Sequence, residues 1–103
     1  MSRGHRQVKK DRNHQEVCDG LRAADMSVVD LSVVGKGCPD ICVGWRGVNV
    51  LLEIKDPAKP PSKRALTEDE AEFQLHWRGH MFVVHSAAEA IAYVEGEVKQ
   101  RRT

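Results

Sequence analysis

Three residues near the middle of the chain have the types and spacing of a hydrolytic site: Asp40, Glu53 and Lys55. Residues 48–55 are typical of a β-strand, in which alternate side chains point to opposite faces. Glu53 and Lys55 then share one face, and the other face is apolar throughout, with Val50, Leu52 and Ile54. An acid and a lysine at the end of an apolar strand do not favour folding unless each has a partner. The pattern therefore indicates either a chemical site or an ion pair.

The chemistry that these residue types suit is hydrolysis of a phosphodiester. If Asp40 begins the strand that pairs with residues 48–55, its carboxylate lies within reach of Glu53. Two such carboxylates repel each other unless a proton or a cation lies between them, and Mg²⁺ usually binds through one or two carboxylates, water and a substrate phosphate. Lys55 would then orient the attacking water or offset charge on the phosphate. An exposed salt-bridge cluster, with Lys55 paired to Glu53 or Asp40, is an equally open alternative.

Three β-strands are predicted around these residues, because β-branched runs there are bounded by glycine and proline. They cover residues 27–34, 40–45 and 48–55. Arg46-Gly47 separates the second strand from the third, a spacing typical of a hairpin. The prolines within residues 56–62 exclude helix and central strand, so an extended loop is predicted there. A fourth short strand is predicted at 80–85.

Three helices are predicted from capping patterns at their starts. The pairs are Asn13 with Glu16, Thr67 with Glu70, and Ser86 with Glu89. The first helix covers residues 13–25, the second ends before Gly79, and residues 100–103 are expected to fray as a tail. The order helix, three strands, helix, strand, helix predicts a mixed α/β domain around one sheet.

Length and composition limit the classes that the chain can belong to. With 103 residues, of which 41% are apolar and 30% charged, residues 1–103 are expected to form a single domain. No apolar run approaches the ~20 residues that cross a bilayer, so no membrane partner is expected. Residues 1–12 hold no apolar segment of a secretory signal, and are predicted to form a basic, flexible arm on a cytoplasmic protein.

Two motifs in this element order resemble the PD-(D/E)xK nuclease superfamily: Gly37-Cys38-Pro39-Asp40 and Glu53-Ile54-Lys55. More narrowly, the chain is similar to the stand-alone VRR-NUC domains of bacteria and their phages. The resemblance spans about residues 15–94. It implies a restriction-endonuclease-like αβββαβ core around one mixed sheet, followed by a C-terminal helix, in a protein of a bacterial or phage-infected cell.

The resemblance also implies the roles of individual residues. Asp40 and Glu53 would be ligands of Mg²⁺ or Mn²⁺, together with the backbone carbonyl of Ile54, and Lys55 would be the catalytic lysine of an enzyme that leaves a 5′-phosphate. No small-molecule cofactor is implied. Members of the family carry a further acid on the first helix, and Glu16 is the matching residue, a weaker candidate for the catalytic and metal-ligand set.

Other candidate residues have competing interpretations. Glu16 lies beside the apolar stripe of the first predicted helix, so it would either reach the sheet edge or only close the capping box with Asn13. Ser32, on the first predicted strand, is a second-tier candidate for bordering the cleft. Trp45 and Trp77 are of a type that stacks on unpaired bases, although residue type alone favours core packing for both.

Charge is nearly balanced over the whole chain, with 16 Lys and Arg against 15 Asp and Glu, but it is unevenly distributed. Basic residues gather in segments 1–12 and 55–64, where they either contact phosphates or remain solvated. The candidates for DNA binding are Lys36, Lys59, Lys63 and Arg64.

The function that these features indicate is a metal-dependent, structure-selective DNA endonuclease, because no base-reading module accompanies the three chemical residues. The VRR-NUC resemblance implies branched DNA, such as a four-way (Holliday) junction cut by a homodimer. A flap or fork nuclease is the alternative within the same chemistry. An alternative of a different class is a non-catalytic nucleic-acid-binding or assembly module that keeps the nuclease fold.

Overall fold

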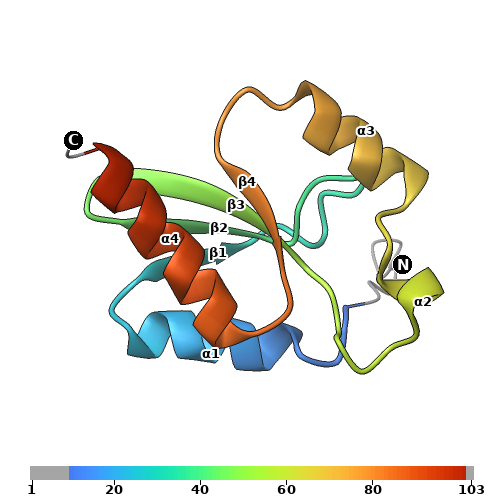
Figure 1. Cartoon of the computed structure of the whole chain (residues 1–103), viewed down its shortest axis with the longest axis horizontal. Helices are drawn as coiled ribbons and strands as arrows, with labels where there is room; N and C mark the ends of the chain where they lie inside the picture. The colour runs from blue at the N-terminus through green and yellow to red at the C-terminus, as the bar shows by residue number, and fades with distance from the viewer. Residues whose placement is uncertain (1–9, 102–103) are drawn as a thin grey trace, which may run out of the picture.

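The computed structural model describes residues 10–101 and has an α/β architecture around one four-stranded mixed sheet (Figure 1). The strands are β1 (Ser27–Asp30), β2 (Ile41–Trp45), β3 (Val48–Ile54) and β4 (Met81–Val84). Within the described range the helices are α1 (His14–Ala23), α2 (Pro61–Arg64), α3 (Glu68–His76) and α4 (Ala87–Arg101). The sheet order is β1-β2-β3-β4, in which β4 runs parallel to β3 and the other pairs are antiparallel. The predicted fold class and the order of the main elements are confirmed.

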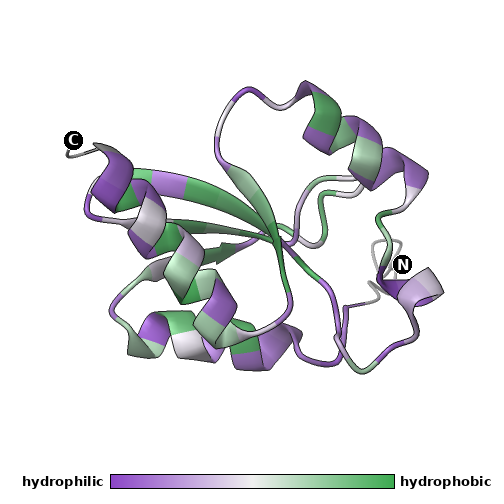
Figure 2. Cartoon of the chain, viewed as in Figure 1, coloured by the Kyte–Doolittle hydropathy of each residue, from purple (hydrophilic) through white to green (hydrophobic). Residues whose placement is uncertain are grey.

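The hydrophobic core lies between one face of the sheet and the helices α1 and α4 (Figure 1). Alternate residues of β2 and β3 point into it, and the central ones are fully buried: Ile41, Val43, Val50 and Leu52. Figure 2 shows the strands as mostly hydrophobic, whereas the helices mix both kinds of residue. Helices α1 and α4 cover this face of the sheet. The residues of β2 and β3 that lie between the core-facing ones point to the opposite face.

The start of α1 is fastened to the ends of two strands by Asn13. Its side-chain amide donates to the carbonyl oxygens of Lys55, at 3.2 Å, and His85, at 2.9 Å. The predicted capping box between Asn13 and Glu16 is wrong, because the Oδ1 atom of Asn13, which would have to accept the capping hydrogen bond, has no hydrogen-bond partner among the described residues. The Thr67 and Glu70 capping box of α3 is confirmed.

Two predicted boundaries differ from the structure. The strand predicted over residues 27–34 ends at Asp30, because the Asp30 carboxylate accepts hydrogen bonds from the N–H and hydroxyl of Ser32 and so forms a turn. Ser32 therefore lies outside the strand. The loop predicted over residues 56–62 ends early, since Pro61 begins α2, and proline suits the first position of a helix.

The predictions for the two ends of the chain are tested only in part. Residues 1–9 of the predicted arm and residues 102–103 of the predicted tail lie outside the described residues. Residues 10–12 are tied to the fold by three ion pairs, which join Lys10 to Asp30, Asp11 to Lys59, and Arg12 to Asp56. At the other end, α4 continues to Arg101, so the first two residues of the predicted tail belong to this helix. None of the helices within residues 10–101 combines the length and apolarity needed to cross a membrane.

Helix α3 stands apart from the layer of α1 and α4 (Figure 1), and none of its residues is buried. The loop before β2 passes directly beneath its first turn. Gly37 has a φ of +79°, and a Cβ atom at this position would collide with the backbone carbonyl of Asp69. Glycine at position 37 therefore allows the close approach that seats α3 on this loop.

We expect Gly37→Ala to destabilise the fold more than Gly35→Ala, a matched control. Gly35 has a φ of +78° with open space around its Cβ position, so alanine there pays only for the left-handed backbone, about 1–2 kcal/mol. At Gly37 the collision with Asp69 adds roughly 1–3 kcal/mol. The free energy of unfolding from urea titration checks this, and equal losses for both variants would contradict the close seating of α3.

Candidate active site

The register of the β2–β3 hairpin brings two predicted site residues together. Ile41 pairs with Leu52 in the antiparallel ladder, so Asp40 comes opposite Glu53. Since Ile41 and Leu52 are buried in the core, Asp40 and Glu53 point to the face that α1 and α4 leave free. The Asp40 Oδ2 atom accepts a hydrogen bond from the N–H of Ile54 at 2.7 Å. The backbone of Ile54, whose carbonyl is an expected ligand, thus borders the same place.

Lys55 joins this pair and is itself buried, with 7% of its surface exposed. Its Nζ lies 2.8 Å from Glu70 Oε1 and 3.7 Å from Glu53 Oε2. Glu53 is only 3% exposed. The alternative interpretation is thus right about the ion pair of Lys55 with Glu53 and wrong about its exposure, because these two charged groups are shielded from water.

Glu70 is a member of the site that the sequence analysis did not identify. It lies in the first turn of α3, where its Oε1 accepts hydrogen bonds from both the Lys55 ammonium and the Thr67 N–H. The capping pattern located Glu70 at the start of a helix. Its contact with Lys55 depends on the packing of α3 against the loop at Gly37. This packing is a tertiary contact that the spacing of residues along the chain does not predict.

The three carboxylates of the site, those of Asp40, Glu53 and Glu70, differ in pKa. Burial, followed by the charge of Asp40 and then by the hydrogen bond with Glu70 and its charge, raises the pKa of Glu53 to about 9. Burial also raises the pKa of Asp40, although the hydrogen bond from the Ile54 N–H opposes it. Glu70 differs, because its bonds from Lys55 and Thr67 outweigh burial and lower its pKa. Glu53 therefore carries the proton, or a cation takes the place of that proton.

Lys55 keeps its positive charge in this setting. Burial alone would lower its pKa, but the hydrogen bond and charge of Glu70, followed by the charge of Glu53, outweigh burial and raise it. Lys55 is therefore a hydrogen-bond donor and a fixed cation, and it does not serve as a proton acceptor near neutral pH.

Helix α1 presents His14 to this region in place of Glu16. Glu16 is exposed. Its negative charge acts on Arg12, whose pKa is raised mainly by Asp56 and more weakly by Glu16. The structure does not bring Glu16 to Asp40 or Glu53. His14 is 3% exposed, and its Nε2 lies 3.4 Å from Asp30 Oδ2.

His14 also influences the site electrostatically. Burial raises the pKa of Asp40, and the charge of His14 opposes this effect. The sequence signal for His14 is its position three residues before Val17, on the buried stripe that continues through Cys18 and Leu21. Extending the stripe back by one turn would have identified it.

The residues present suit a divalent cation with oxygen ligands. Glu53 Oε1 is buried and receives no hydrogen bond from a described N–H or O–H group. The Glu53 carboxyl instead lies within hydrogen-bonding reach of the carboxylates of Asp40 and Glu70, a contact that needs a shared proton or a cation. Within residues 10–101, no group of three or more His, Cys, Asp and Glu side chains forms a complete metal-ligand set. Two carboxylates and a backbone carbonyl match Mg²⁺ or Mn²⁺, which complete their coordination with water and phosphate.

The candidate DNA-binding residues occupy different settings. Lys36 is exposed in the loop beneath α3, and Lys63 is exposed on α2. Arg64 is half-buried, with an Nε atom that lacks a described hydrogen-bond partner. Lys59 is engaged, since its Nζ lies 2.6 Å from Asp11 Oδ1. Ser32 bonds to Asp30, and no described contact joins it to the carboxylates.

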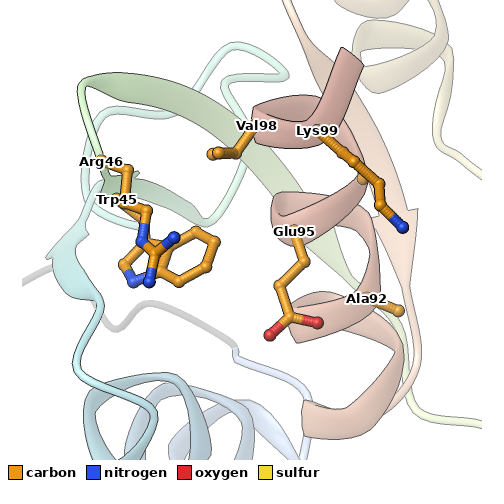
Figure 3. Close-up of a pocket in the computed structure, with 7 residues that line it drawn as sticks. Trp45, Arg46, Ala92, Glu95, Val98 and Lys99 are labelled. Atoms are coloured by element: carbon orange, nitrogen blue, oxygen red, sulfur yellow. The ribbon is translucent and has the colours of Figure 1, made fainter. Parts of the chain in front are cut away.

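A separate hollow of about 470 Å³ lies at the opposite end of β2, between the hairpin turn and α4. Figure 3 shows Trp45 and Arg46 across from Glu95 and Val98 of α4, while the side chain of Lys99 points away from them. The guanidinium of Arg46 lies 4.4 Å from the centre of the Trp45 ring, and Trp45 packs against the core as its residue type predicted. This hollow contains no pair of carboxylates and does not suit the chemistry of the Asp40 site.

Comparison of the chain with protein-family models, curated proteins and solved structures gave no match. The assignment to the PD-(D/E)xK superfamily therefore remains a hypothesis that depends on the motifs and on the geometry described above.

We expect the stability of the metal-free protein to fall as the pH rises, because of Glu53. Its pKa in the folded state is about 9, above the ordinary value of 4.5, so the unfolded chain releases this proton first. The stabilisation from protonated Glu53 is complete below about 4.5 and is lost as the pH approaches about 9. Between about pH 6 and pH 8.5 in EDTA, wild type should lose on the order of 1–3 kcal/mol more than Glu53→Gln, measured by urea unfolding.

The control for this experiment is Glu68→Gln, which changes an exposed acid of α3. This variant should keep the pH slope of wild type. Added Mg²⁺ should reduce the loss at high pH in wild type and not in Glu53→Gln, since the ion offsets the buried charge. Equal pH slopes for wild type and Glu53→Gln would contradict the raised pKa.

Proposed function

We propose that this protein is a metal-dependent nuclease of the PD-(D/E)xK superfamily, close to the stand-alone VRR-NUC domains, that hydrolyses phosphodiester bonds of DNA. One observation carries the proposal: Asp40, Glu53 and Lys55 converge at one end of the β2–β3 hairpin, where the buried carboxyl of Glu53 lies against other carboxylates. Two adjacent carboxylates and a lysine are the groups that metal-assisted phosphodiester hydrolysis requires.

In this mechanism each residue has a distinct task. Asp40 and Glu53 would hold Mg²⁺ or Mn²⁺ with the Ile54 carbonyl, and the bound ion supplies Lewis acidity toward the phosphate and activates the attacking water. Lys55, protonated and oriented by Glu70, donates a hydrogen bond to that water or to a phosphate oxygen. Because Glu70 already accepts from Lys55, its role is to position the ammonium group.

Branched DNA is the substrate class that we propose, with a four-way junction first and a flap or fork second. A homodimer would place two active sites for paired cuts. Support for a dimer comes from β1, which forms an edge of the sheet, and from exposed apolar side chains on and after it: Val29, Val33 and Val34. An exposed apolar group beside an open strand edge suits self-association.

The first test is cleavage of labelled DNA by purified protein with Mg²⁺ or Mn²⁺. The panel contains duplex, single strand, flap, fork and four-way junction. Asp40→Asn and Lys55→Ala should each lower the cleavage rate by at least about 100-fold, because each removes a group that acts on the reacting phosphate. Asp25→Asn, an exposed acid beyond the far end of α1, is the matched control and should cleave as wild type does.

The outcomes of this test are distinct. Paired symmetric nicks on the junction would support a dimeric resolvase, while cuts only at flaps or forks would support the alternative substrate. Wild-type rates in Asp40→Asn or Lys55→Ala would refute the assigned site. DNA binding with no metal-dependent cleavage would favour the non-catalytic module.

The basic segment around α2 should contribute to the salt dependence of DNA binding. Replacing Lys63 and Arg64 together by alanine should weaken binding and reduce the slope of log K against log salt by about 1–2, since each phosphate contact on duplex DNA contributes roughly 0.9. Lys59→Ala should change the slope less, because Asp11 already neutralises this lysine. An unchanged slope in the double variant would remove α2 from the DNA contact surface.

A further inference from the structure

An aromatic pair at the C-terminal end of α3 consists of a half-buried Phe73 and an exposed Trp77. The rings of Phe73 and Trp77 are stacked, with centroids 5.2 Å apart and planes inclined by 16°. Trp77 is 46% exposed, so the expectation of core packing from its residue type is wrong for this tryptophan. Figure 2 shows hydrophobic colour on the C-terminal half of α3, which no other element covers in Figure 1.

The indole of Trp77 is supported on two sides. Phe73 stacks on one face, and Gly79 lies against an edge, where a Cβ atom would come within 2.9 Å of Nε1. A hollow of about 490 Å³ borders the ring and is lined by His76, Trp77, Arg78 and Gly79. With one face on Phe73 and almost half of the residue exposed, the second face is available to a flat ligand.

The aromatic pair lies on the same face of α3 as the residue that enters the candidate active site. Glu70 and Phe73 lie along one side of α3, at the spacing i, i+3, and Trp77, the C-cap residue, stacks on Phe73 at the end of that side. Glu70 contacts Lys55, so this side of the helix faces the reacting groups at its N-terminal end. Seven residues of helix span about 10 Å, close to three steps of about 3.4 Å along a DNA strand.

The surroundings favour a nucleobase over a second protein chain as the occupant. Arg78 is an exposed cation next to Trp77 that lines the same hollow, and arginine is a residue type that contacts phosphates. Aromatic side chains bind unpaired bases by stacking, whatever the sequence, and each stacked base is worth about 1–3 kcal/mol. The direct continuity with the carboxylate site would place such a base a few nucleotides from the scissile bond.

We propose that the Phe73–Trp77 pair is a stacking platform for an unpaired base next to the cleavage site, and that it selects DNA in which a strand leaves the duplex. This inference rests on the proposed nuclease function, since it supplies the substrate preference of that site. Paired bases inside a blunt duplex have no free face to offer, so the platform adds affinity only where DNA is forked, flapped or branched.

The test is equilibrium binding in EDTA, where no metal-dependent cleavage takes place. The probes are a forked DNA with 2-aminopurine at the first unpaired position and a blunt duplex of the same length. Trp77→Ala should weaken fork binding by about 5- to 100-fold and abolish the quenching of 2-aminopurine. Its affinity for the blunt duplex should stay within about twofold of wild type, because phosphate contacts are retained.

Two further variants serve as controls. Trp77→Phe keeps an aromatic face and should retain most of the fork preference. Leu75→Ala, which trims a 75% exposed apolar residue of the same helix, should bind fork and duplex as wild type does. Equal loss on fork and duplex in Trp77→Ala, or no fork preference in wild type, would overturn the platform.

The result separates this inference from the proposed hydrolysis and from self-association. Loss of fork preference in Trp77→Ala would support the platform even if wild type cut no DNA, whereas full cleavage with an unchanged fork preference would overturn the platform alone. Sedimentation analysis of wild type and Trp77→Ala without DNA provides the last check. A dimer that dissociates on this substitution would overturn the proposal, because a second copy of the chain would then cover the rings.

Discussion

The site depends on one electrostatic constraint: three carboxylates lie close together where water is largely excluded, and a single ammonium group pairs with two of them. Asp40, Glu53 and Glu70 cannot all be ionised beside Lys55 without a further positive charge, since buried like charges repel strongly. The metal-free protein meets this constraint by keeping a proton on Glu53. A divalent cation meets it differently, because it displaces the proton and uses the same oxygen atoms. Proton and metal thus compete for one place.

The register of the hairpin determines whether this place exists. Arg46 and Gly47, in the turn between β2 and β3, both have positive φ, 50° and 82°, as a two-residue type I′ turn requires. That turn fixes which residues of the two strands face each other, and Asp40 then lies opposite Glu53. A slip of one residue would move Leu52 out of the core and Glu53 into it. The same burial that stabilises the sheet therefore holds the carboxylates together.

Sequence patterns predicted the parts of this site that are close along the chain. The alternation of side chains along β3 places Glu53 and Leu52 on opposite faces, and the short hairpin brings Asp40 opposite Glu53. The two-residue period of the strand and the turn residues are therefore enough to predict this pair. They fail for Glu70 and His14, because the faces that α1 and α3 turn toward the sheet depend on tertiary packing. Glu16 illustrates the error. Its position on α1 suited an acid near the sheet, yet the Asn13 contacts set a helix rotation that buries His14 and exposes Glu16.

Helix α3 joins the chemistry to the proposed substrate preference, because it holds Glu70 in the site although none of its residues is buried. Its described attachments to the rest of the fold are polar or made by backbone, through Glu70 to Lys55 and through Asp69 to Gly37, so it gains little from the hydrophobic core. A strand stacked on Trp77 would restrain the same helix that holds Glu70 against Lys55. The free energy of stacking would then order the lysine as well as bind the DNA, and the bond to be cut would lie beside a base that has left the duplex.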